Sequence, residues 1–271
     1  MATNLSGKNA DKIPEAEHLD EIAKQCKLYR LRWQPEYEHF IDIARKSSQA
    51  EDFGSEFVRF LSEVSDEYRG KTGAALLRQM GSPELLVKPY DSCLNKMYRL
   101  NVAWNKKWPQ EREGGVVTPE NWSNHFDDLI RCTLVARYLD GVEVLRSKLT
   151  AHFSGKSYAC EDRWLGRPSG YYACHFYFKR SFEFVNTSGY PATINTKVEI
   201  QLTTEMQENI RSMLRSKYET TRDQGDNWKV DQWKYDSKDF AASYIGHTLH
   251  FIEGLIVKLR NESFGESNAK S

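Results

Sequence analysis

Two carboxylates stand where the flanking residues predict β-strands, a place where acids are uncommon. Asp128, after Asp127, precedes the apolar run LIRCTLV, and Glu199 lies between aliphatic residues in KVEIQLTT. Acidic side chains are disfavoured in strands unless they have a partner or face water. On neighbouring strands, Asp128 and Glu199 could hold Mg²⁺, which takes one or two carboxylates and completes its shell with water and phosphate oxygens. The alternative is a half-exposed strand whose acids face solvent.

The stretch GRPSGYYACHFYFK, residues 166–179, predicts a turn followed by a strand with an aromatic ring and an imidazole on one face. Period-two alternation places Tyr171, Ala173, His175 and Tyr177 together, with the apolar residues on the other face. A flat ring near a cation, here Arg167 in the turn, suits a nucleotide base and its phosphate. The alternative is an ordinary half-buried tyrosine and a hydrogen-bonded core histidine.

The spacing of apolar residues predicts which elements position these groups. Helical spacing covers 14–70, a short helix is expected over 72–80, and a strand over 129–139 that ends in a turn at Asp140-Gly141. A helix over 142–153, strands over 171–184 and 196–204 with a hairpin connection at 185–195, and a helix over 206–222 follow. The last element, 238–261, is an amphipathic helix with Ser237 as its N-cap.

This order of elements predicts an α+β fold: a mixed sheet of about five strands flanked by helices, with an N-terminal helical region and a long C-terminal helix. Along the chain we expect a disordered lead over 1–13, a helical region over 14–114, the sheet-containing core with its C-terminal helix over 115–262, and a loose tail over 263–271.

The composition narrows the class of protein. Lys plus Arg and Asp plus Glu are both 38 in 271 residues, so the chain has no dominant electrostatic footprint for nucleic acid or membrane. The five cysteines show no CxxC spacing and no apolar leader precedes them, which favours a reducing cytoplasm. No run approaches the roughly 18 apolar residues of a membrane helix, so no membrane partner is expected.

Three motifs in order resemble the synthetase domain of the RelA/SpoT family: Asp128-Leu129-Ile130, Gly170-Tyr171 through to His175, and Glu199-Ile200-Gln201. The resemblance covers roughly residues 115–225. It implies a nucleotidyltransferase-like synthetase fold and Mg²⁺-dependent transfer of pyrophosphate from ATP to the ribose 3′-hydroxyl of a guanine nucleotide, giving (p)ppGpp. It also implies site roles: Asp128 and Glu199 bind the metal, Glu199 activates the hydroxyl, Tyr171 stacks on the acceptor base, and His175 and Gln201 orient the acceptor. Positive charge for the phosphates is expected from Arg99, Arg131, Arg137 and Arg167.

The chain also departs from the family pattern. Arginine positions of the family hold Thr133, Tyr172 and Thr203, a serine position holds Ala173, and Arg131 stands where the family usually has glycine. The ATP-binding segment Arg-x-Lys-x-x-x-Ser-x-x-x-Lys is not recognised upstream of Asp128. Arg99 is taken as its nearest trace, and the lysines that could replace it, each otherwise a solvated surface charge, are Lys88, Lys96, Lys106 and Lys107.

Three functions therefore remain open from the sequence. The first is alarmone synthesis from ATP and a guanine nucleotide. The second is a toxin-like relative that pyrophosphorylates adenine nucleotides or the 3′ end of tRNA, with a protein antitoxin as partner. The third is a degenerate domain that only binds nucleotides or partners. Two further features have simpler explanations. His247 and His250 are a conceivable metal pair without a third ligand nearby in sequence, and a core role is favoured for His247. The Trp-rich stretch 227–236 suits a cover for a core edge.

Overall fold

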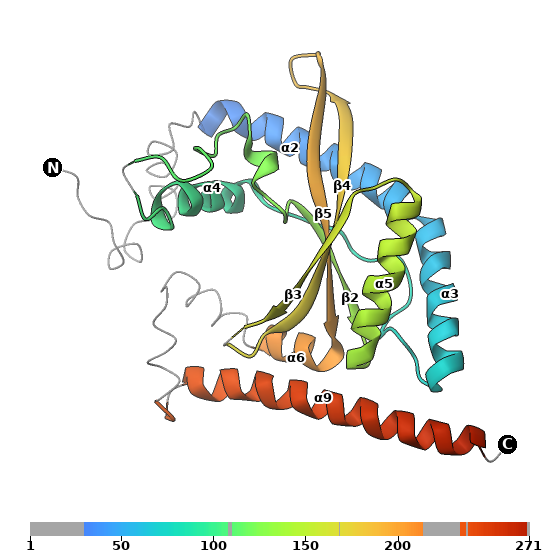
Figure 1. The fold of residues 1–271 in the computed structure, drawn as a ribbon. Coiled ribbons are helices and arrows are strands. Elements are labelled where there is room, and N and C mark those ends of the chain that lie inside the picture. Colours follow the sequence, from blue (N-terminus) through green and yellow to red (C-terminus); the bar gives the residue numbers. More distant parts are fainter. Residues whose placement is uncertain (1–29, 108–109, 168, 214–233, 237, 270–271) are drawn as a thin grey trace. The chain divides into compact units, whose positions relative to one another are not determined.

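The fold is α+β, as expected, with helices flanking a mixed five-stranded sheet (Figure 1). The computed structural model describes residues 30–107, 110–167, 169–213, 234–236 and 238–269. The helices are α2 (Arg30–Ser47), α3 (Ser55–Thr72), α4 (Tyr90–Tyr98), α5 (Leu139–Gly155), α6 (Glu205–Met213) and α9 (Lys238–Ala269). The strands are β1 (Leu86–Val87), β2 (Ile130–Ala136), β3 (Cys160–Gly166), β4 (Tyr172–Val185) and β5 (Pro191–Thr204), in the order β1-β2-β5-β4-β3.

Within this order, β3 pairs antiparallel with β4, with Arg163 opposite His175. The arrows of β2 and β5 run the same way in Figure 1, which makes the sheet mixed. Of the helices that the structure describes, none combines the length and the apolar character that crossing a membrane requires.

Contacts within the chain divide it into two compact units, neither continuous in sequence. Unit 1 comprises residues 1–48, 85–130 and 179–198, and unit 2 comprises 49–84, 131–178 and 199–271. The long strands β4 and β5 run through both units. These units cut across the linear division at residues 114 and 115 that the sequence suggested.

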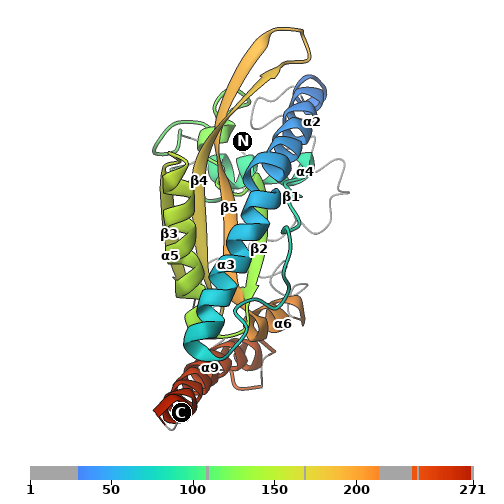
Figure 2. The same ribbon diagram turned by 90° about the vertical axis from the view of Figure 1, so that its right-hand side faces the viewer.

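The core of unit 2 forms between helices and the apolar faces of the strands. α3 presents Phe57, Leu61 and Val64 at helical spacing and packs against α5 (Figure 2). From α5, Phe153 stacks on Phe178 of β4 with ring centroids 4.1 Å apart, and both rings are fully buried. The apolar face of β4 is thereby committed to packing, which leaves Tyr171, His175 and Tyr177 on the opposite face.

The core of unit 1 contains a cluster of aromatic rings. Trp33, Tyr37 and Phe40 of α2 meet Trp122, whose ring lies 5.2–5.8 Å from each of theirs. Edge-to-face rings at such distances add stability beyond their buried area. The generous aromatic content of the sequence is therefore used in part as packing.

One expected helix and one expected turn do not form. Thr72 ends α3, because Gly73 adopts φ +69° and its N–H caps Arg69 O, so no helix forms over 73–80. That segment instead bonds the end of β2, where Arg137 N–H donates to Leu76 O. Asp140 and Gly141 form no turn; they lie in the first turn of α5, where Gly141 allows close contact with Leu76.

Two element boundaries also differ from expectation. β4 and β5 extend into the expected hairpin connection, leaving only residues 186–190 between them. α9 continues to Ala269, through most of the expected loose tail, because the Phe264 ring packs over the bare Cα of Gly73. The disordered lead, the N-cap Ser237, residues 214–222 of the expected helix and most of the Trp-rich stretch lie outside the described residues.

Candidate active site

In unit 1, Asp128 is held between two lysines. Its Oδ2 accepts a hydrogen bond from Nζ of Lys88 (2.7 Å), and its Oδ1 accepts one from Nζ of Lys96 (2.5 Å). The Lys88 backbone N–H donates to Leu129 O, which fixes the chain after β1 beside the entrance to β2. Burial would raise the pKa of Asp128, but the two lysines more than offset it and hold that pKa below its usual range. The Asp128 carboxylate is therefore ionised.

The spacing of these two lysines matches part of the ATP-binding pattern expected upstream of Asp128. Lys88, Ser92 and Lys96 have the spacing of the lysine, serine and lysine in Arg-x-Lys-x-x-x-Ser-x-x-x-Lys, with Leu86 at the arginine position. Lys96 follows Ser92 by one helical turn on α4, so both lie on one side of that helix. Lys88 and Lys96 are not solvated surface charges, since their side chains are only 12% and 19% exposed. Their role as the lysines of an ATP-binding segment stays a prediction.

Other charges of unit 1 have structural partners. Asp127 pairs with Lys197 at 2.9 Å rather than with the lysines of Asp128. The guanidinium of Arg99 lies 5.4 Å from the centre of the Trp104 ring, in the helical turn that follows α4. Its assignment to phosphate binding stays a prediction.

In unit 2, the buried carboxylate of Glu199 has one hydrogen-bonded oxygen and one without a partner among the described residues. Oε1 lies 2.6 Å from Nδ1 of His175 and accepts a hydrogen bond from the Tyr177 hydroxyl (3.3 Å). Oε2 is buried and has no hydrogen-bond partner among the described residues. The side chain is only 4% exposed, so the solvent-facing alternative for Glu199 is wrong. A buried oxygen without a donor is the kind of group that a ligand satisfies.

Hydrogen bonds confirm that Tyr171, His175 and Tyr177 share one face, which we call the working face. The Tyr171 hydroxyl lies 3.1 Å from Nε2 of His175, whose other ring nitrogen faces Glu199. Burial raises the pKa of Tyr171, although Arg211 partly offsets it. With Nδ1 of His175 donating to Glu199, its Nε2 accepts from Tyr171. Tyr177 shares this face, as the alternation required, but sequence reasoning gave it no role.

Gln201 has a partner that sequence reasoning missed. Arg211 of α6 donates to Gln201 Oε1 (2.9 Å) and to Glu208 (3.0 Å). α6 starts directly after β5, and Thr204 Oγ1 accepts from the backbone N–H of Gln207 in its first turn. The sequence signal for this contact was a basic residue, Arg211, in the amphipathic helix that follows the Glu199-Ile200-Gln201 strand. Arg211 fixes the Gln201 carbonyl oxygen, which leaves the amide nitrogen as the donor that this residue offers.

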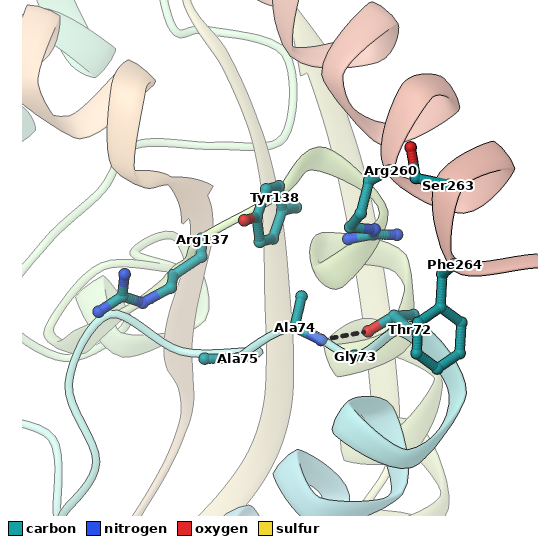
Figure 3. Close-up of a pocket in the computed structure, with 9 residues that line it drawn as sticks. All are labelled: Thr72, Gly73, Ala74, Ala75, Arg137, Tyr138, Arg260, Ser263 and Phe264. Atoms are coloured by element: carbon teal, nitrogen blue, oxygen red, sulfur yellow. Dashed lines mark hydrogen bonds between the residues drawn. The ribbon is translucent and has the colours of Figure 1, made fainter. Parts of the chain in front are cut away.

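The three other arginines predicted to bind phosphate lie at separate places in the described structure. Arg131 lies on the half-exposed face of β2 and Arg167 is exposed in the turn before β4. Arg137 lines a pocket of about 530 Å³ whose other residues include Arg260 and Tyr138, and Figure 3 shows its guanidinium directed away from Arg260. None of the predicted acceptor residues lines this pocket, so these phosphate roles stay predictions.

The two histidines of α9 contact Tyr172. Nδ1 of His247 lies 2.8 Å from the Tyr172 hydroxyl, and the His250 ring stacks on the Tyr172 ring at 3.7 Å. Among the described residues, no group of three or more His, Cys, Asp and Glu side chains could hold a metal ion. The packing role favoured for His247 is therefore the one that its contacts support.

The two predicted magnesium ligands differ in how well they suit a cation. Glu199 offers its open Oε2, a hard oxygen that fits Mg²⁺. Both oxygens of Asp128 bond to lysines, so a cation there would have to displace at least one ammonium group. Asp128 and Glu199 belong to different units, and their sharing of one ion stays a prediction.

Comparisons with known proteins identify the fold. No family model matches the chain, and no curated protein matches it in sequence. Among solved structures, small alarmone synthetase 1 from Bacillus subtilis superposes with a TM-score of 0.54 at 16% identity, covering 84% of this chain and 98% of that one. A GTP pyrophosphokinase family protein from Streptococcus pneumoniae superposes with a TM-score of 0.50 at 18% identity, covering 84% and 96%. The chain therefore has the fold of the small alarmone synthetases.

Proposed function

We propose that the protein transfers a pyrophosphoryl group from ATP to the ribose 3′-hydroxyl of GDP or GTP. The observation that carries the proposal is the open, buried Oε2 of Glu199, whose Oε1 is already fixed by His175 and Tyr177. A carboxylate that is oriented through one oxygen and has no hydrogen bond on the other is suited to accept a proton from a bound hydroxyl. The shared synthetase fold agrees with this class of reaction.

In the proposed step, the acceptor 3′-oxygen attacks the β-phosphorus of ATP. A new bond forms between the 3′-oxygen and that phosphorus, the bond from the β-phosphorus to the oxygen shared with the α-phosphate breaks, and AMP leaves. The hydroxyl proton passes to Glu199 Oε2. The hydrogen bonds from His175 and Tyr177 to Oε1 orient the carboxylate and keep it in one rotamer.

Lys88 and Lys96 support binding of the ATP phosphates. Asp128 positions their ammonium groups, which are the kind of preorganised donor that binds phosphate oxygens. Mg²⁺ would neutralise phosphate charge in this reaction, and Asp128 would bind it only after releasing at least one of its two lysines. The matching spacing through Ser92 argues against a domain that has lost its ATP segment.

Tyr171, His175 and Gln201 would bind the acceptor. The Tyr171 ring supplies the stacking surface, and Gln201, fixed by Arg211, presents its amide N–H groups. Tyr172 and Ala173 replace residues of the family pattern in this loop, so the acceptor is the feature of the proposal that most needs direct measurement.

The test supplies γ-labelled ATP and Mg²⁺ with GDP, GTP, AMP, ADP or bulk tRNA in separate reactions. We expect label on GDP or GTP; label on adenine nucleotides or tRNA instead would refute the guanine acceptor and support the toxin-like alternative. Glu199→Gln should reduce transfer by about 10²-fold or more, the scale of general-base catalysis. Glu183→Gln, an exposed acid on β4, is the matched control and should keep full activity. Wild-type turnover in Glu199→Gln would disprove the role of Glu199.

A further inference from the structure

The turn that precedes β4 is in direct backbone contact with α9. Gly170 has φ +77°, and a Cβ built on it would lie 2.3 Å from Ser243 O. A Cβ built on Gly246 would lie 2.3 Å from Gly170 O. Neither position has room for a side chain, so the two glycines let the turn and the helix touch. Gln207 of α6 donates to Gly246 O at 3.3 Å and holds the helix at the same point.

Tyr172 extends this contact by two interactions of different kinds. Its ring is stacked on His250, with an interplanar angle of 2°, and its hydroxyl is hydrogen-bonded to His247. Burial, and then the charge of His247, lowers the pKa of His250, which favours the neutral ring at pH 7. Tyr172 stands where the resemblance leads one to expect arginine, so this chain uses the position for packing against α9.

The residue directly before Tyr172 faces the opposite way and belongs to the candidate site. Tyr171 bonds His175 on the working face, and its carbonyl accepts from the Arg167 N–H across the turn. Tyr171 and Tyr172 are joined by one rigid peptide unit, so a shift of the Tyr172 backbone also shifts the backbone of Tyr171. A helix that fixes Tyr172 therefore fixes the ring that would stack on the acceptor.

We propose that His247 and His250 of α9 are positioning residues for the acceptor site, acting through Tyr172 on Tyr171. The proposal rests on the proposed function for its effect on acceptor binding, but the positioning itself is independent of it. Both histidines contact Tyr172, whereas His175 and Tyr177 are the residues that hold Glu199, so loss of either histidine should weaken acceptor binding without removing the proton acceptor.

The experiment compares His250→Ala, His250→Phe, Tyr172→Phe and Phe251→Ala with wild type. His250→Ala removes the stacked ring, and His250→Phe restores one. Tyr172→Phe keeps the stack and removes only the hydroxyl bonded to His247. Phe251→Ala is the matched control, because Phe251 neighbours His250 on α9 but is 66% exposed.

Two readouts are measured for each variant: amide hydrogen exchange of the peptide spanning 166–175, and KM for acceptor and ATP. We expect His250→Ala and Tyr172→Phe to speed exchange in this peptide and raise the acceptor KM about two- to tenfold, since an aromatic pair or one hydrogen bond contributes on that scale. The KM for ATP and kcat should stay within twofold, and His250→Phe should restore the acceptor KM. Phe251→Ala should match wild type in both readouts.

Unchanged exchange in the 166–175 peptide of His250→Ala would overturn the proposal, whatever the activity. Faster exchange with an unchanged acceptor KM would overturn the effect on the acceptor. Equal losses in His250→Ala and His250→Phe would show that the stack is not what positions the loop. If the wild type transfers label to no acceptor, the proposed function fails, and the exchange data alone then decide whether α9 positions the turn.

Discussion

The pairing of Asp128 with two lysines predicts that Asp128→Asn destabilises the ligand-free protein. The substitution leaves the ammonium groups of Lys88 and Lys96, which are 12% and 19% exposed, without a carboxylate. Removing one partner of a fully buried ion pair costs about 3–5 kcal/mol, and surface pairs contribute about 0–1 kcal/mol. These side chains lie between the two cases, so we expect a loss of about 2 kcal/mol.

The loss should be visible in thermal unfolding without nucleotide. For a chain of this size, 1 kcal/mol shifts Tm by about 2–4 °C, so the expected drop is about 4–8 °C. Asp127→Asn is the control on the neighbouring residue, since Asp127 pairs with one lysine and is 29% exposed. That variant should lose at most about 1 kcal/mol.

The opposite result has a clear meaning. A carboxylate kept only to bind a cation is neutral or unfavourable in the ligand-free fold, because functional sites carry charge that does not stabilise the protein. If Asp128→Asn unfolds at or above the wild-type temperature, the lysine pairs do not stabilise the ligand-free protein and the reasoning from them is refuted.

Three further predictions follow from the same contacts. Lys96→Met should raise the KM for ATP more than that for the acceptor, measured in the transfer assay; a change confined to the acceptor would contradict the assignment of Lys96 to the ATP phosphates. Arg260→Met should lower the free energy of unfolding by about 1–2 kcal/mol in urea titrations, since Arg260 bonds Asp140 and Tyr68 and lies over the Tyr138 ring; an unchanged midpoint would refute this. Burial raises the pKa of Glu253, so this residue favours the fold below its unfolded-state pKa and loses that contribution as pH rises. Glu253→Gln should therefore have a higher Tm than wild type, and the difference in Tm should widen from pH 5 to 8. A difference in Tm that stays constant with pH would contradict the raised pKa.

Much of the sheet and one face of the site could be predicted because strand periodicity is a local property. The β2 run alternates buried and half-exposed residues from Ile130 to Ala136, so Arg131 and Thr133 share a face as expected. The same rule placed Tyr171, His175 and Tyr177 together, and hydrogen bonds confirm it. These results needed only the geometry of an extended chain.

The errors arose where a distant segment changed the local outcome. Residues after Gly73 have helical composition, yet they bond to the end of β2. The tail after residue 262 is polar, yet Phe264 packs over Gly73 and the helix continues. Local propensity is a weak prior that such tertiary contacts override.

The sequence by itself determined the strand faces, the order of the three motifs and the carboxylate in β5, because alternation and spacing are written in neighbouring residues. Only the tertiary structure decided which side chains became partners: Lys88 and Lys96 with Asp128, Arg211 with Gln201, and the histidines of α9 with Tyr172. Tyr172 and His247 are 75 residues apart along the chain. Ion pairs and ring stacks act over a few ångströms, so they depend on how the chain folds back on itself, which spacing along the sequence does not encode.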